Sequence, residues 1–325
     1  MIPSRDVELA AETLRRGGLV AFPTETVYGL GADALNPSAV GRLFAVKGRP
    51  SCHPLIVHLA SAEELPAWAA RISEAARRLA EVCWPGPLTL LVEKNAGVPD
   101  VTTGGLASVG LRVPCHPIAL ELLQRFGGGI AAPSANRFGR VSPTRAEHVV
   151  ADLGDDVDLL LDGGECSVGL ESTILDVRAE TPVLLRPGAV TVERIESILG
   201  SRVSRSVSSE ARAPGMLASH YAPRARVEVV AAAALRERAQ QLTLQGERVA
   251  LLLSSEIEHE SISSLQWVIL FDLGQSTEVA AQRLYAALRA ADTQGASVVL
   301  ASPPVASGLG EALADRLGKA AAPRP

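Results

Sequence analysis

The chain has 325 residues, of which 47% are hydrophobic and 21% are charged. This composition is typical of a globular protein and excludes wholesale disorder. The net charge is -5, which argues against a chain that wraps nucleic acid over its whole surface.

The length predicts two domains or one large domain, because domains usually hold about 100 to 200 residues. A stretch at 201–226 is rich in Ser, Ala, Arg and Pro and has no sustained apolar period, which is typical of a linker. We therefore predict a first domain over residues 1–203, a linker over 204–225 and a C-terminal domain over 226–325.

Short apolar runs alternate with turn signals along the first domain. The pair Asn36-Pro37 supplies the cap and the first turn of a helix. Predicted strands outnumber predicted helices, so we expect an α/β fold with a twisted, mixed, open sheet. The predicted strands cover residues 19–22, 55–59, 88–92, 109–113, 130–132, 159–161, 172–177 and 183–185, and the predicted helices cover 38–46 and 69–82.

The C-terminal domain shows a regular alternation of strands and helices. This order predicts βαβ units and therefore a small, largely parallel, Rossmann-like α/β fold. No nucleotide-binding fingerprint occurs there. The predicted strands cover 227–230, 249–253, 267–271 and 297–300, and the predicted helices cover 233–244, 277–291 and 309–318.

Several classes of protein are excluded by what the sequence lacks. No apolar run reaches the roughly 18 residues that span a bilayer, and the N-terminal segment lacks the apolar core of a signal peptide. The four cysteines lie far apart with no C-x-x-C pair, so we expect no metal site, no disulfide framework and a cytoplasmic location. No P-loop, His-Glu-x-x-His or G-x-S-x-G motif occurs.

Polar side chains follow the first predicted strand in the segment PTETVYGLG, residues 23–31. Its two threonines and Glu25 serve either as turn and capping residues or as ligands, and the residue types alone do not decide between the two. The letters at 29–34 match a dinucleotide fingerprint. No helix begins inside that segment, so a glycine turn is the better interpretation.

A second cluster, KGRPSCHPL at 47–55, places Lys47 and Arg49 at the end of the helix predicted over 38–46. Cations are favoured at a helix C-terminus by its dipole. A Lys and an Arg two residues apart also suit a clamp for anionic oxygens. The chain has 28 Arg and only three Lys, so a lysine inside a polar cluster is unusual for this sequence.

Further clusters lie in or after predicted strands. Arg112 alternates with apolar residues in SVGLRVP, so it faces away from the valines and meets either a carboxylate ligand or solvent. Ser134 and Asn136 offer donors after a predicted strand, and GLESTI at 169–174 is followed by Arg186. Several polar loops at strand ends indicate one pocket on which they converge.

These motifs together resemble the threonylcarbamoyl-AMP synthase family, which has the YrdC-like fold. The matching segments are PTETVYGLG, KGRP with PLIVHL, WPGPLTLL, VGLRVP, Ser134-x-Asn136, GLESTILD and LLRPG, in the family's order, over residues 5 to about 200. A second domain after SHYAP is similar to the long form of that enzyme.

The resemblance implies a synthase that forms threonylcarbamoyl-AMP and pyrophosphate from L-threonine, bicarbonate and ATP with magnesium, for threonylcarbamoyladenosine modification of tRNA. It also implies that a downstream threonylcarbamoyl transferase complex receives the product, with no direct nucleic acid and no membrane required. The alternative is a YrdC-like RNA-binding paralogue without synthase activity. Residues 1–205 carry 20 basic and 24 acidic groups, which argues against RNA as the main ligand.

Site residues follow from the same resemblance. The family's basic signature corresponds to Lys47, Arg49, Ser134 and Asn136, with Lys47 at the phosphates. One departure is Cys52-His53, where the family often has Asp-Asn; the imidazole of His53 can still donate a hydrogen bond. The implied threonine contacts are Thr26, His58, Arg112, Ala132 and Ser172. The implied ATP contacts are Arg49, His53, Ser108, Ser134, Ser142, Arg186 and, from the linker and closing over ATP, Tyr221.

Overall fold

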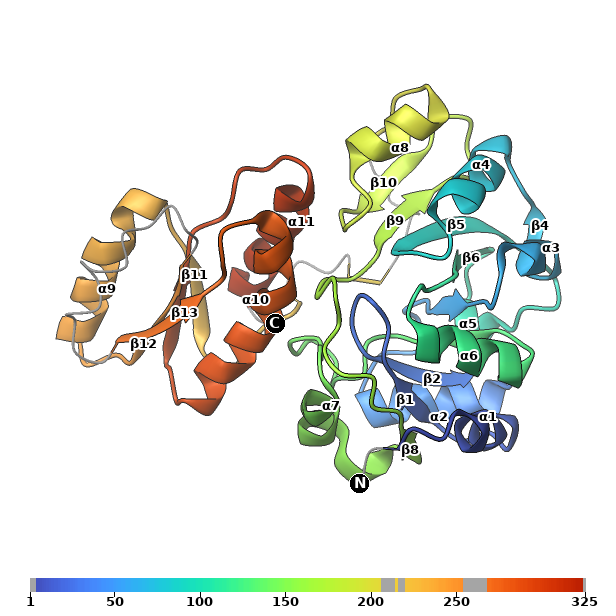
Figure 1. Ribbon diagram of the computed structural model, residues 1–325, viewed down its shortest axis with the longest axis horizontal. Helices are drawn as coiled ribbons and strands as arrows, with labels where there is room; N and C mark the ends of the chain where they lie inside the picture. The colour runs from blue at the N-terminus through green and yellow to red at the C-terminus, as the bar shows by residue number, and fades with distance from the viewer. Residues whose placement is uncertain (1–3, 206–213, 216–219, 254–267, 324–325) are drawn as a thin grey trace. The chain divides into compact units, whose positions relative to one another are not determined.

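The computed structural model describes residues 4–205, 214–215, 220–253 and 268–323, which form two compact units (Figure 1). Unit 1 comprises Met1–Phe138, Ser142–Ser167 and Glu171–Met216, and unit 2 comprises Gly139–Val141, Val168–Leu170 and Leu217–Pro325. The three-part division predicted above stays a prediction. Residues 206–213 and 216–219 of the predicted linker lie outside the described residues.

Unit 1 is built on a mixed sheet whose described strands have the order β10-β9-β5-β6-β3-β7-β2-β1-β8, with β4 beside β5. The pairs β3–β6, β5–β9 and β1–β8 are parallel and the other pairs are antiparallel. The predicted mixed, open α/β sheet is thus confirmed. The strands are β1 (Val20–Phe22), β2 (Gly29–Asp33), β3 (Ile56–His58), β4 (Ala69–Arg71), β5 (Leu88–Lys94), β6 (Ser108–Arg112), β7 (Ile130–Ala131), β8 (Leu159–Leu160), β9 (Thr173–Asp176) and β10 (Val183–Arg186).

Capping residues mark the two ends of helix α2 in unit 1. The Asn36 side chain accepts hydrogen bonds from the Ser38 and Ala39 amides and so caps α2, as predicted, and Gly48 ends that helix at a φ of 61°. The helices are α1 (Val7–Arg15), α2 (Pro37–Lys47), α3 (Leu65–Trp68), α4 (Glu74–Cys83), α5 (Asp100–Thr103), α6 (Pro117–Phe126), α7 (Ala146–Leu153) and α8 (Val192–Leu199). Short 3-10 turns cover Ala62–Glu64 and Gly154–Asp156.

Two local predictions are wrong. The helix predicted over 69–82 starts later, because the Ser73 hydroxyl caps α4 and the preceding residues pair with β5 as β4. The glycine turn expected at 29–34 is largely strand β2, which pairs with β1 and β7. A Cβ on Gly31 would lie 2.9 Å from Phe22 Cε1, so the glycine permits close packing inside a sheet.

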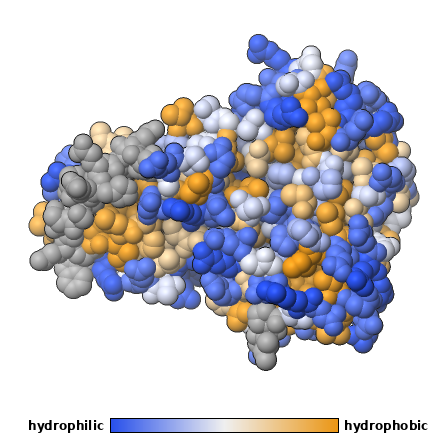
Figure 2. All heavy atoms as spheres, in the orientation of Figure 1, coloured by the Kyte–Doolittle hydropathy of each residue, from blue (hydrophilic) through white to orange (hydrophobic). Residues whose placement is uncertain are grey.

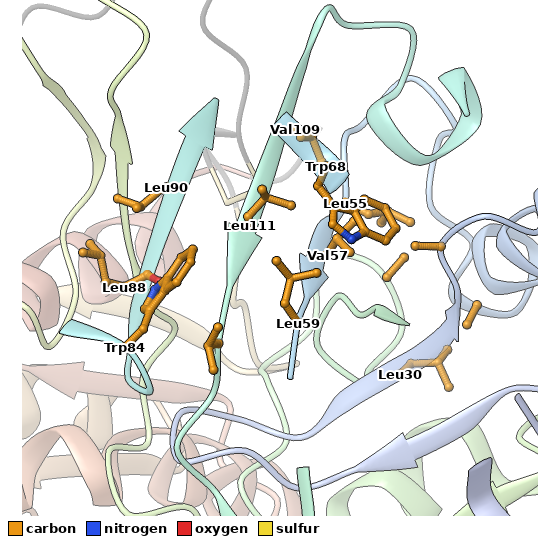
Figure 3. Packing of buried hydrophobic residues seen from close by; sticks show 14 of the residues in the cluster. Leu30, Leu55, Val57, Leu59, Trp68, Trp84, Leu88, Leu90, Val109 and Leu111 are labelled. Atoms are coloured by element: carbon orange, nitrogen blue, oxygen red, sulfur yellow. The ribbon is translucent and has the colours of Figure 1, made fainter. Parts of the chain in front are cut away.

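Two hydrophobic cores lie on opposite faces of the sheet, as the alternation in β1 shows. Leu19 and Ala21 belong to one core, whereas Val20 and Phe22 belong to the other. Figure 3 shows part of the larger core, where Trp68, Val57 and Leu59 lie near one another and Trp84 lies beside Leu88. Figure 2 shows hydrophilic side chains over much of the rim of unit 1, with hydrophobic ones between them.

Unit 2 contains a parallel four-stranded sheet in the order β11-β14-β12-β13 among its described residues. The predicted small parallel α/β fold is therefore confirmed, although Trp267, the first residue of one predicted strand, lies outside the described residues. Its elements are β11 (Arg226–Val229), a 3-10 turn at Ala232–Ala234, α9 (Leu235–Leu244), β12 (Val249–Leu253), β13 (Val268–Asp272), α10 (Thr277–Thr293), β14 (Val298–Ala301) and α11 (Leu309–Ala321). No helix in the described part of the chain is long and apolar enough to cross a membrane.

Candidate active site

Buried polar side chains meet in the middle of the unit 1 sheet. His58 on β3 is in register with Arg112 on the parallel strand β6 and with Ile130 on β7. Arg112 is 4% exposed and His58 is 3% exposed. Ala132 follows β7, and its amide donates to the Ile56 carbonyl at 2.9 Å. Adjacent strands thus place three of the predicted threonine contacts close together.

Arg112 does not meet solvent, because the carboxylate of Glu25 lies against it. Arg112 Nη2 is 2.7 Å from Glu25 Oε1 in an ion pair whose two side chains are each 4% exposed. The guanidinium also donates from Nη1 to Thr26 Oγ1 at 3.0 Å and from Nε to the Gly86 carbonyl at 3.3 Å. Neither Nη2 nor Oε1 has a hydrogen-bond partner of suitable geometry among the described residues. The ion pair therefore holds and neutralises the guanidinium at Nη2.

The loop after β1 is organised by its own hydroxyls. Thr24 Oγ1 accepts from the amides of Thr26 and Val27 at 3.2 Å each, and it lies 2.8 Å from Thr26 Oγ1. Glu25 Oε2 accepts from the Cys115 amide at 3.2 Å. The sequence leaves open whether these residues are turn and capping residues or ligands. In the structure Thr24 stabilises the loop, while Glu25 and Thr26 face Arg112.

His58 is held in its neutral form. Burial, together with the nearby positive charge of Arg112, lowers the pKa of His58 to about 3. Its Nδ1 atom is buried and has no hydrogen-bond partner among the described residues. A buried, neutral imidazole beside Arg112 suits a group that orients a ligand.

Ser172 lies between the Arg112 strand and Arg186. Its Oγ atom is 2.8 Å from Thr89 Oγ1, on β5. Arg186 donates to the Ser172 carbonyl at 3.0 Å, to Ser172 Oγ at 3.2 Å and to the Pro214 carbonyl at 3.0 Å. Ser108, at the start of β6, is also buried. Arg186 thus fixes a predicted threonine contact although it is itself a predicted ATP contact.

The loop that carries Ser134 and Asn136 is tied to Lys47. Lys47 Nζ donates to the carbonyls of Ser134 and Asn136 at 2.5 Å each, and the Phe138 amide donates to the Lys47 carbonyl at 2.9 Å. Lys47 is 2% exposed. Burial, and next the charge of Arg49, lower its pKa well below the ordinary value for lysine.

Arg49 and His53 share Phe138 as a neighbour. The Arg49 guanidinium carbon lies 5.7 Å from the centroid of the Phe138 ring, and the His53 ring lies 5.4 Å from it, edge on. Arg49 Nη2 also donates to the Pro54 carbonyl at 2.9 Å. The residues of the basic signature are thus connected in unit 1, through the backbone carbonyls of Ser134 and Asn136 at Lys47 and through the Phe138 ring at Arg49.

Two other predicted ATP contacts lie in different settings. Ser142 is fully buried and donates to Glu171 Oε1 at 2.6 Å. Tyr221 belongs to unit 2, where its ring stacks on Tyr285 with centroids 5.8 Å apart and lies 5.2 Å from the Arg316 guanidinium. Its closure over ATP stays a prediction.

The buried polar residues Glu25, Thr89 and Glu171 of this region are absent from the predicted site, as is Thr24 in the loop after β1. Glu25 and Glu171 lie in the segments 23–31 and 169–174, which the sequence analysis identifies as polar clusters. An acidic residue in such a cluster is the sequence feature that could have indicated them. Thr89 sits in an apolar strand, where nothing in the sequence marks it. Within the described residues, no group of three or more His, Cys, Asp or Glu side chains is arranged to hold a metal ion.

Comparison with known proteins gives matches over nearly the whole chain. A family model described as "Telomere recombination" matches residues 12–188, and one described as "Threonylcarbamoyl-AMP synthase, C-terminal domain" matches residues 190–322. The threonylcarbamoyl-AMP synthase of Pyrococcus abyssi is 44% identical, covering 97% of this chain and 93% of that protein. The Bacillus subtilis protein of the same name is 40% identical, covering 97% and 92%.

A solved structure agrees with the sequence matches. The crystal structure of P. abyssi Sua5 complexed with L-threonine has a TM-score of 0.89 and 43% identity, covering 97% of this chain and 94% of that chain. The similarity in fold therefore extends through both units.

Proposed function

The chain belongs to the threonylcarbamoyl-AMP synthase family, and we propose that unit 1 carries its active site, with threonine bound at Arg112 and ATP bound beside Arg49 and Arg186. The chain forms threonylcarbamoyl-AMP and pyrophosphate from L-threonine, bicarbonate and ATP, a step in tRNA modification.

The observation that carries the threonine site is the buried guanidinium of Arg112. Its side chain is 4% exposed, Arg112 is in register with His58 on the next strand, and Nη2 faces the carboxylate of Glu25. A carboxylate is the natural acceptor for such N–H groups. Thr26 touches the same guanidinium. We place the threonine carboxylate at Arg112, with Thr26, His58, Ala132 and Ser172 around the rest of the amino acid.

For ATP we propose the connected group around Phe138. Arg49 supplies a planar fork for phosphate oxygens, and Ser134, Asn136 and His53 supply donors. Lys47 belongs to this group through the loop that its ammonium holds. The remaining proposed contacts are Ser108, Ser142, Arg186 and Tyr221.

The chemistry needs positioning more than a covalent intermediate. The threonine amine and bicarbonate give a carbamate, and a carbamate oxygen attacks the α-phosphate while pyrophosphate leaves. Several anions meet in this step, so fixed positive charges and alignment supply most of the rate enhancement. Arg186 contacts Ser172, so it links the threonine side to the nucleotide side.

We propose that magnesium enters with ATP and stays on its phosphates. The described residues offer no cluster of metal ligands, and Mg²⁺ commonly binds through substrate phosphates with few protein ligands. When bound, it neutralises phosphate charge. We also propose a cytoplasmic enzyme that passes its product to a threonylcarbamoyl transferase complex; the four cysteines are all free, in agreement with a reducing compartment.

Pyrophosphate release tests the activity directly. We expect release that requires L-threonine, bicarbonate and ATP together. L-threonine and ATP should also raise the melting temperature more together than either does alone, because both bind the native state. Release of pyrophosphate without threonine would contradict the proposed assignment of the site.

A further inference from the structure

Glu25 is a buried carboxylate for which the synthase reaction has no obvious use. It lies 2.7 Å from the guanidinium that we assign to the threonine carboxylate, and its other oxygen accepts from the Cys115 amide. A carboxylate beside the binding group for another carboxylate repels the ligand, so its presence needs a physical reason.

We propose that Glu25 is a specificity-determining residue that makes the threonine site electrically neutral, so that the site selects a zwitterion over an amino-acid analogue carrying only the carboxylate. This inference rests on the proposed threonine site.

Charge balance is the first argument. Arg112 contributes one positive charge and Glu25 one negative charge, and each side chain is 4% exposed. A zwitterion brings no net charge, so the filled site remains neutral. An anion would leave one uncompensated negative charge in a buried place, which is strongly unfavourable.

The titratable neighbours of the pair carry no charge near neutral pH. Burial and the Arg112 charge lower the pKa of His58 to about 3. Burial, with Glu25 as the next cause, raises the pKa of the Cys115 thiol to about 11. Burial raises the pKa of Cys166 to about 12, with Glu25 adding to the effect, and lowers the pKa of His116. Arg112 and Glu25 therefore set the charge at the carboxylate end of the site, while the charge of Arg186 lies on the Ser172 side.

Geometry is the second argument. Glu25 Oε1 lies 2.7 Å from Arg112 Nη2, so the two opposite charges are in direct contact although the pair lies outside the geometry of a hydrogen bond. Glu25 thus holds and neutralises the guanidinium at Nη2, while Nη1 and Nε donate to Thr26 and to the Gly86 carbonyl. Its Oε2 atom stays anchored to the Cys115 amide.

Isothermal titration calorimetry with two ligands tests the proposal. One ligand is L-threonine, and the other is its α-hydroxy acid analogue, in which a hydroxyl replaces the amine. We expect the wild-type protein to prefer threonine. Glu25→Gln should lower that preference at least about tenfold, since its site carries a net positive charge that favours the anion. Glu25→Asp, which restores the charge, should keep the preference near the wild-type value.

A matched control is Glu74→Gln, which removes an exposed carboxylate paired with Arg77 on α4. We expect no change in ligand preference there. If Glu25→Gln weakens both ligands by the same factor, Glu25 is only structural and the proposal is wrong.

A second measurement needs no variant and applies even if Glu25→Gln fails to fold. The wild-type protein should bind threonine more tightly than both the anionic α-hydroxy acid and the cationic L-threoninamide, and equal affinity for the anion would overturn the proposal. The proposed threonine site is tested separately with Arg112→Gln. If this variant binds threonine as tightly as the wild type, threonine does not bind at Arg112, whatever the role of Glu25.

Discussion

The ammonium of Lys47 lies 2.5 Å from the backbone carbonyl oxygen of Ser134, although 87 positions separate the two residues in the chain. The Asn136 carbonyl accepts from the same nitrogen. A compact ammonium fits between two converging carbonyls, whereas the wide planar guanidinium of arginine does not. This contact accounts for a lysine at this position in a chain that has 28 Arg and three Lys.

Removal of the Lys47 ammonium should disable turnover. Lys47→Met keeps the apolar stem but leaves the buried carbonyl of Asn136 and the partly buried carbonyl of Ser134 without their donor, which costs up to about 1–3 kcal/mol for each group. The Ser134–Asn136 loop then shifts, and a displacement of about 1 Å at reacting groups lowers rates about 100-fold. Pyrophosphate release measures the rate, and thermal unfolding shows whether the fold survives.

Two further variants sharpen this prediction. Lys47→Arg should also lose turnover. It keeps the positive charge, but its planar guanidinium does not fit between the carbonyls of Ser134 and Asn136. Lys94→Ala, which removes a lysine paired with Asp100, should leave turnover nearly unchanged. Full activity in Lys47→Arg would show that charge alone matters there.

The ion pair of Arg112 and Glu25 should show strong coupling in a double-mutant cycle. Arg112→Gln leaves Glu25 buried without its cation, and breaking such a pair destabilises a protein by about 3–5 kcal/mol. The double variant Arg112→Gln with Glu25→Gln should regain most of that stability but should not regain threonine binding. Denaturant unfolding and calorimetry measure the two effects separately. Additive stability losses would show that the pair does not interact.

The fold was largely accessible from the sequence, since apolar runs and turn signals predict most strands of both units. The exceptions have physical causes. Strand β2 contains Gly29 and Gly31, residue types that favour turns, yet tight packing against Phe22 requires them in a strand. The start of α4 is set by Ser73 and by pairing of the preceding residues with β5, which is a tertiary contact. Propensity in one stretch of chain contains no information on that pairing.

For the site, the sequence identifies candidate residues but not their partners. Arg112 is expected to meet a carboxylate ligand or solvent, whereas in the structure it meets the carboxylate of Glu25, a partner that the sequence does not indicate. These residues lie on different elements, so only the folded sheet brings them together. The same holds for Lys47, whose partners are backbone carbonyls that no side-chain pattern reveals.

The buried imidazole of His58 should make stability depend on pH. Its pKa is about 3 in the folded protein and 6.5 ordinarily, so the unfolded chain binds the proton more readily between these values. Stability is therefore present above the ordinary pKa and is lost as pH falls through this window, by about 1.4 kcal/mol per unit. Lowering the pH from about 6.5 to about 4.5 should cost the wild type about 2 kcal/mol more than His58→Gln.

Urea unfolding of wild type and His58→Gln at both pH values measures this difference, and effects of the other carboxyl groups cancel between the two proteins. Equal losses in both proteins would mean that His58 does not remain neutral in the fold.

Arg186 should affect both substrates, because it is assigned to ATP and also holds Ser172 through the carbonyl and the hydroxyl. Arg186→Lys keeps the charge but loses the fork that reaches these oxygens and the Pro214 carbonyl. We expect the KM values for ATP and for threonine each to rise about tenfold, which corresponds to the loss of about 1.4 kcal/mol of binding free energy.

Two control variants accompany this prediction. Ser172→Ala should raise only the KM for threonine. Arg178→Lys, at an arginine paired with Asp176, should change neither KM value. A rise for ATP alone in Arg186→Lys would show that Arg186 does not position Ser172 for threonine, and the link between the two halves of the site would then have to run through another residue.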